Sequence, residues 1–91
     1  METTKYQEIQ LLELYWKYAL KGKCRLVNIY DGYKIIFPSG ADVIQHEYSY
    51  GGTEGCVEFA GVDEEIDYSA VDFQTALNTL KVFYDKLSKK A

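Results

Sequence analysis

The chain has 91 residues, of which 47% are hydrophobic and 26% charged, and its formal net charge at pH 7 is −4. That length suits one domain with one core, and the apolar content excludes a disordered chain. The acidic balance argues against direct binding to nucleic acid or to an anionic membrane, because both need a basic surface.

The first predicted element is a helix over residues 4–20. Apolar side chains recur there at helical spacing, Thr3 or Thr4 suits the N-cap, and Gly22 suits the position just past the end. Residues 11–20 are almost all apolar or aromatic, which is more than one buried helix face needs, so part of this surface is a candidate contact between two copies of the chain. The predicted buried stripe consists of Ile9, Leu12, Trp16 and Ala19.

The hydrophobic period then changes to two, which predicts four strands, at residues 23–30, 33–37, 41–50 and 56–62. Asp31-Gly32 is predicted to be the two-residue loop of the first hairpin, with positive φ at both positions. A short run at residues 66–68 is a candidate fifth strand at the sheet edge. One face of the third strand is predicted to turn toward the core, with Gln45 on the opposite face. That core-facing set is Ile44, His46, Tyr48 and Tyr50.

The glycine-rich segment 51–55 is predicted to be a mobile hairpin tip, because it lacks the lysine and the following helix of a phosphate-binding loop. A second amphipathic helix is predicted over residues 70–89, with Ser69 and Asp72 arranged as in a capping box. The order of helix, four or five antiparallel strands and helix predicts a single α+β domain over residues 1–91. Both helices are expected on one face of this meander, with the other face left to solvent.

Charge is distributed unevenly along the chain. Between Ile35 and Leu80 there are nine carboxylates and no lysine or arginine, and all ten basic residues lie outside this stretch. One interpretation is ordinary solvated surface. The other is a surface that meets a basic partner, because clustered charge raises association rates and suppresses wrong partners, and the interleaved tyrosines are typical of interface cores. The candidate partner-binding residues are Glu47, Tyr48, Tyr50, Glu54, Glu58, Asp63, Glu64, Glu65 and Asp67.

The residues that most often carry chemistry are few. His46 is the only histidine, and Cys24 and Cys56 are the only cysteines. A nucleophile–base pair or a zinc site built from them would need the fold to bring them together, and the paired local spacing of structural zinc sites is absent. The acids at residues 63–67 lack the spacing and the glycine of a calcium loop. No catalytic residue, metal ligand or cofactor is therefore assigned from the sequence.

Two segments resemble small uncharacterised α+β proteins of bacteriophages and prophages. The first covers residues 37–40 and 43–52 and contains the pattern His-x-x-Ser-Tyr-Gly at residues 46–51, and the second is the strand-like run 55–60. The resemblance covers about a third of the chain, and its motif carries no known chemistry. It implies a phage or mobile-element origin, and small acidic phage proteins often bind and block a host protein, including nucleic-acid-binding defence enzymes.

The leading hypothesis is thus a non-enzymatic interaction protein whose acidic, tyrosine-bearing surface binds a basic host protein, as a phage inhibitor with an anti-defence role would. The first alternative is a self-associating structural or accessory protein, a homodimer through the aromatic helix and a sheet edge. The second is a small metal-dependent or His46-dependent enzyme. A cytoplasmic location is expected, because residues 1–10 have no apolar signal-peptide region and no apolar run reaches the length of a membrane span.

Overall fold

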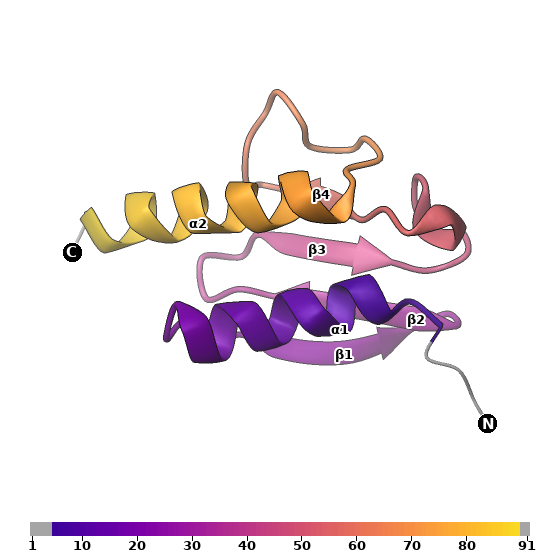
Figure 1. Ribbon diagram of the computed structural model, residues 1–91, viewed down its shortest axis with the longest axis horizontal. Helices are drawn as coiled ribbons and strands as arrows, with labels where there is room; N and C mark the ends of the chain where they lie inside the picture. The colour runs from indigo at the N-terminus through magenta and orange to yellow at the C-terminus, as the bar shows by residue number, and fades with distance from the viewer. Residues whose placement is uncertain (1–4, 90–91) are drawn as a thin grey trace.

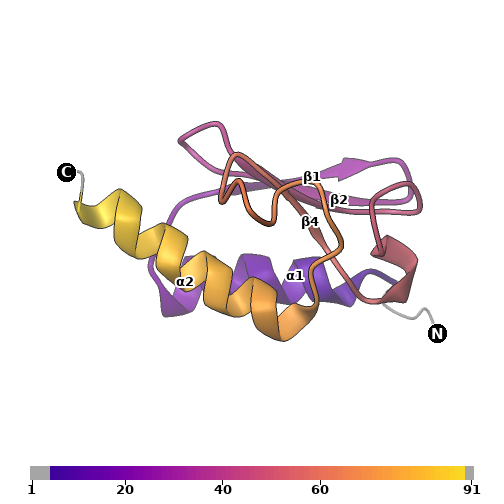
Figure 2. The same ribbon diagram turned by 90° about the horizontal axis from the view of Figure 1, so that it is seen from above.

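The structure is a computed structural model that describes residues 5–89. Four antiparallel strands form one sheet in the order β1-β2-β3-β4, so each strand pairs with its neighbour in the chain (Figure 1). Both helices lie on the same face of the sheet, and no element of the described residues covers the other face (Figure 2). The predicted α+β meander between two helices is confirmed. The elements are α1 (Gln7–Leu14), a π-helical turn that continues it (Tyr15–Ala19), β1 (Arg25–Ile29), β2 (Gly32–Ile36), β3 (Asp42–Gln45), a 3-10 turn (Gly52–Glu54), β4 (Glu58–Ala60) and α2 (Phe73–Lys89).

The first helix begins without a capping side chain of its own. Tyr6, at the N-cap, has φ 60° and makes no side-chain capping bond, and the threonines predicted as caps lie outside the described residues. The buried amide of Gln45 on β3 replaces the cap, because its Oε1 accepts the Ile9 N–H at 3.0 Å. Its Nε2 donates to Glu8 Oε1 and to the Gly52 carbonyl, each at 3.0 Å. One polar side chain therefore joins α1, β3 and the 3-10 turn.

The end of this helix also differs from the prediction. A π-helical turn is wider than an α-helical one, which rotates the residues that follow, and Ala19 is exposed rather than buried. The left-handed position past the end is taken by Lys21, with φ 62°, and not by Gly22. Gly22 is needed for space instead, because a Cβ there would collide with the indole of Trp16. That indole is 2% exposed and donates its Nε1–H to the Lys23 carbonyl at 3.0 Å.

The hairpin loop between β1 and β2 is Tyr30-Asp31, one residue earlier than predicted. Pairing of Ile29 with Gly32 places Gly32 inside the sheet. Of the two loop residues, Tyr30 alone has a positive φ, at 55°. The glycine serves close packing rather than the turn, since a Cβ at Gly32 would collide with the carbonyl of Gln45 on β3.

The strand register separates a core face from an open face. Val43 and Gln45 turn toward the helices and are fully buried, so the predicted orientation of the third strand is wrong. Ile44 lies on the open face, and β3 ends at Gln45, which leaves Tyr48 in an exposed turn. The row of core-facing residues across the sheet is Leu26, Ile35, Val43 and Phe59.

The segment after β4 covers the outer edge of that strand without forming the predicted fifth strand. The Tyr68 N–H donates to the Phe59 carbonyl at 2.9 Å, and Val57 and Val71 exchange two backbone hydrogen bonds of 2.8 Å. Residues 66–68 are a turn, because Tyr68 has φ 62° and cannot continue an extended strand.

The second helix lies across the sheet face beside α1 (Figure 2). Its first turn is capped by Asp72, whose Oδ1 accepts the Thr75 N–H at 2.8 Å. Ser69, predicted as the cap, lies outside the helix and donates its hydroxyl to the Ile66 carbonyl at 2.6 Å. The Thr75 N–H also lowers the pKa of Asp72, so the cap carries negative charge at the positive end of the helix. The helix buries Ala76, Leu80 and Phe83.

Candidate interaction surface

Two loops meet at one end of the sheet, and their aromatic side chains cluster there. The loop between β1 and β2 supplies Tyr30, and the segment after β3 supplies His46 and Tyr48. The Tyr30 ring lies 5.0 Å from that of Tyr48 and 4.8 Å from the imidazole, measured between ring centroids. Tyr30 and Tyr48 are each 69% exposed, whereas His46 is 4% exposed. We call residues 30–31 and 46–55 the sheet tip.

Asp31 holds the sheet tip in place. Its Oδ2 accepts the Tyr6 hydroxyl at 2.6 Å and lies 3.4 Å from Lys5 Nζ, while its Oδ1 accepts the Glu47 N–H at 3.0 Å. The Tyr6 hydrogen bond, aided by those from Glu47 and Lys5, lowers the pKa of Asp31, so this carboxylate is charged at neutral pH. In return, Asp31 raises the pKa of Tyr6 to about 12. The aromatic cluster therefore rests on a network that reaches back to the start of α1.

His46 organises the turn after β3. Its backbone N–H donates to Ser49 Oγ at 3.0 Å, and that hydroxyl donates back to the His46 carbonyl at 2.9 Å. Its Nδ1 accepts the Tyr48 N–H at 3.0 Å, which places the proton of the neutral ring on Nε2. His46 is thus tied into the backbone, and this bond orients Tyr48 for contact with Tyr30.

The glycine-rich segment, predicted to be a mobile tip, is a packed turn. Gly52 is buried, and its carbonyl is bonded to the amide of Gln45. The N–H groups of Glu54 and Cys56 both donate to the Gly51 carbonyl, at 3.0 and 2.9 Å. This packing fixes where the sheet tip presents Glu54, which is exposed.

The nine predicted partner-binding residues lie in three places. Four are in the sheet tip, four are in the turn after β4, and Glu58 lies on the open face of β4. The Tyr50 N–H donates to Glu58 Oε1 at 3.0 Å, which brings Glu58 next to the sheet tip. The sheet-tip residues are Glu47, Tyr48, Tyr50 and Glu54, and those of the turn are Asp63, Glu64, Glu65 and Asp67.

Two acids of the turn after β4 stabilise the local backbone. The carboxylate of Asp67 accepts the N–H groups of Gly61, Val62 and Asp63 at 2.9 to 3.2 Å. Asp63 Oδ1 accepts the Glu65 N–H at 3.0 Å. Asp63 and Asp67 therefore have a structural role, because the N–H groups of a loop need hydrogen-bond acceptors. Glu64 and Glu65 are exposed.

The sequence predicted that one sheet face is left to solvent, but not that this open face is apolar at its centre. The strands contain pairs of neighbouring apolar residues. Because side chains alternate along a strand, one residue of each pair faces the core and the other makes the open face aliphatic. Burial raises the pKa of Asp42 on this face; Glu58 and Asp67 raise it further, and Lys34 opposes the rise. Its aliphatic residues are Val27, Ile29, Ile36 and Ile44, and its charged residues are Arg25, Lys34, Asp42 and Glu58.

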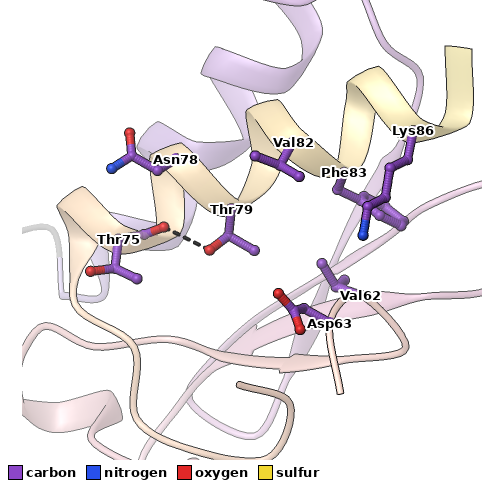
Figure 3. Close-up of a pocket in the computed structure, with 8 residues that line it drawn as sticks. All are labelled: Val62, Asp63, Thr75, Asn78, Thr79, Val82, Phe83 and Lys86. Atoms are coloured by element: carbon purple, nitrogen blue, oxygen red, sulfur yellow. Dashed lines mark hydrogen bonds between the residues drawn. The ribbon is translucent and has the colours of Figure 1, made fainter. Parts of the chain in front are cut away.

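A shallow groove runs between α2 and the turn after β4 (Figure 3). Asp63 and Lys86 stand at its two sides, Phe83 forms part of its floor, and its volume is about 170 Å³. Such a volume is below the usual range of cofactor sites. A wider apolar hollow of about 450 Å³ lies at the far end of the helices, next to Trp16 and Leu87.

Both cysteines are free, and burial, with Glu13 nearby, raises the pKa of the Cys24 thiol, which lowers its reactivity. No three His, Cys, Asp or Glu side chains among residues 5–89 come close enough to hold a metal ion. Neither helix in that range has the length and apolar content needed to cross a membrane.

In comparisons with known proteins, no family model, no curated protein and no solved structure matches the chain.

Proposed function

We propose that this chain is a non-enzymatic interaction protein that binds a basic protein partner through its sheet tip. The observation that carries the proposal is the pair of exposed rings, Tyr30 and Tyr48, held by an ordered network and flanked by the exposed carboxylates Glu47 and Glu54. Rigid tyrosines provide contact area at a low entropic cost, and exposed acids steer a cationic partner toward them.

The internal hydrogen bonds of the sheet tip support this proposal. Asp31 and the Nδ1 atom of His46 both accept backbone N–H groups of the tip, so the ring cluster is organised before any partner arrives. A preorganised surface loses less conformational entropy on binding than a flexible one. The acids of the turn after β4 would extend the same negative field along the sheet edge.

Inhibition of a host protein, in the cytoplasm of the host, is the specific form of this proposal. It rests on the resemblance to phage proteins alone. A partner that normally binds nucleic acid would offer the basic groove that an acid–tyrosine surface fits, and the chain itself would not bind nucleic acid.

Affinity capture from the native host, followed by titration of the retained protein, tests the proposal. We expect a basic protein whose affinity falls as salt rises, and falls at least about tenfold in the variant Tyr30→Ser/Tyr48→Ser, because buried interface tyrosines carry a large share of binding energy. Glu64→Gln/Glu65→Gln measures the contribution of the turn after β4.

The matched control is Glu13→Gln/Asp85→Asn, which removes two charges from the helices and leaves the sheet tip intact. It should bind like the wild type. A partner whose affinity is unchanged by the tyrosine substitutions, or indifferent to ionic strength, would contradict the proposal.

A further inference from the structure

The open face of the sheet is apolar at its centre, although no described element covers it (Figure 2). Its four aliphatic side chains are half-buried by their neighbours in the sheet, yet none belongs to the set that packs against the core. On a solvated face of an antiparallel sheet these positions are normally polar. The residues are Val27, Ile29, Ile36 and Ile44.

The charges around this apolar centre are separated by sign. Arg25 on β1 and Lys34 on β2 make one half of the open face positive, and Asp42 on β3 and Glu58 on β4 make the other half negative. The pairing register fixes this order, because Ile36 lies between Arg25 and Asp42 in one row across the sheet. Lys34 and Glu58 stand on either side of Ile44 in the next row.

We propose that a second copy of the chain covers the open face, with a two-fold axis parallel to the strands. Rotation about that axis lays β1 of one copy over β4 of the other, and β2 over β3. The positive half of each face then meets the negative half of its partner. The central strands, which carry Ile36 and Ile44, lie over each other, and Val27 and Ile29 lie over β4 of the partner. An axis across the strands would place like charges together, so the charge pattern selects one of the two arrangements of an aligned sandwich.

The area of the open face limits the affinity expected for this dimer. Four strands of three to five residues, spaced ~4.8 Å apart and rising ~3.3 Å per residue, cover roughly 300 Å² per copy. Two such faces bury less than a standard stable interface of about 1,200–2,000 Å², so the dimer is reversible and concentration-dependent. The same axis puts both sheet tips at one end of the dimer, although the inference does not depend on what the tips bind.

Sedimentation from about 1 µM to about 1 mM, the range of moderate to weak affinities, tests the proposal. The wild type should pass from monomer to dimer within it. Arg25→Glu/Lys34→Glu makes the face wholly acidic, and Asp42→Lys/Glu58→Lys makes it wholly basic, so each variant alone should dimerise at least about tenfold more weakly. An equimolar mixture of the two should restore a dimer, because the opposed faces are complementary again.

The control Lys86→Glu/Lys89→Glu changes the net charge by the same amount as Arg25→Glu/Lys34→Glu, but on α2. It should dimerise like the wild type. Circular dichroism and the fluorescence of Trp16 establish that each variant is folded. If the basic variant does not fold, Ile36→Lys, a single charge at the centre of the face, takes its place and should also block dimerisation. A wild type that stays monomeric at about 1 mM overturns the proposal.

The proposal also fails if the charge variants dimerise unchanged while Leu11→Ser/Tyr18→Ser abolishes dimerisation. Leu11 and Tyr18 are 47% and 65% exposed on the first helix, and that result would place the contact there.

Discussion

Gln45 is the side chain whose loss should most damage the fold. In the substitution Gln45→Leu, the Ile9 N–H and the Gly52 carbonyl lose their partners, and both residues are buried. An unsatisfied buried group costs about 1–3 kcal/mol, and the added apolar burial of leucine offsets part of the sum. We expect a net loss of about 3 kcal/mol in the free energy of unfolding, out of roughly 5–14 kcal/mol for a domain of this length.

Urea denaturation followed by the fluorescence of Trp16 measures this loss. The midpoint should fall with an unchanged slope, and the melting temperature should fall by roughly 12–24 °C for about 3 kcal/mol in a domain of this size. Gln10→Leu is the matched control, because the Gln10 amide makes only long bonds of 3.4 and 3.5 Å to backbone carbonyls. A loss below about 1 kcal/mol for Gln45→Leu would refute the assignment of Gln45 as the tertiary cap of α1.

Three further predictions concern the hairpin and its network. Tyr30→Asn should raise the free energy of unfolding by up to about 1 kcal/mol, because asparagine tolerates the φ of 55° better than tyrosine; a lower urea midpoint would contradict this. Gly32→Ala should destabilise by about 1–3 kcal/mol through overpacking against the Gln45 carbonyl; an unchanged urea midpoint would place Gly32 outside the packed sheet. The raised pKa of Tyr6 stabilises the fold below pH 10, and this is lost as pH rises toward about 12. The lowered pKa of Asp31 stabilises it above pH ~4, and this is lost on acidification. In Tyr6→Phe, the free energy of unfolding should therefore fall less steeply with pH at both the acid and the alkaline end. Unchanged slopes at both ends would exclude the Tyr6–Asp31 pair as their source.

The sequence predicted well what depends on near neighbours in the chain. The apolar stripe of α2 and the acid that caps it are local patterns, so the helix was expected within three residues of its observed start at Phe73. Period-two alternation and turn residues were enough for the meander. The hairpin loop was misplaced by one residue because glycine suggests a turn, while Gly32 serves the close approach of β3.

Contacts distant in sequence explain the larger errors. Val43 and Ile44 are both apolar, so alternation alone does not say which one faces the core. The polar side chain of Gln45 is expected at the surface from the sequence alone. It is buried because the start of α1, 36 residues away, packs over it. The sheet tip was partly predicted through Glu47 and Tyr48. An open sheet face was also predicted, but its apolar residues and its charge order were not, because a surface formed by four strands requires their register.

The two edges of the sheet have different exposure, and this limits how copies of the chain can aggregate. The outer edge of β4 is occupied by the segment around Tyr68 and Val71, whereas β1 pairs with β2 alone among the described residues. A fibril needs two free edges on every subunit, one to receive a strand and one to offer the next. Strand addition at β1 of a single copy therefore stops after one partner, because the β4 edge of that copy is already occupied.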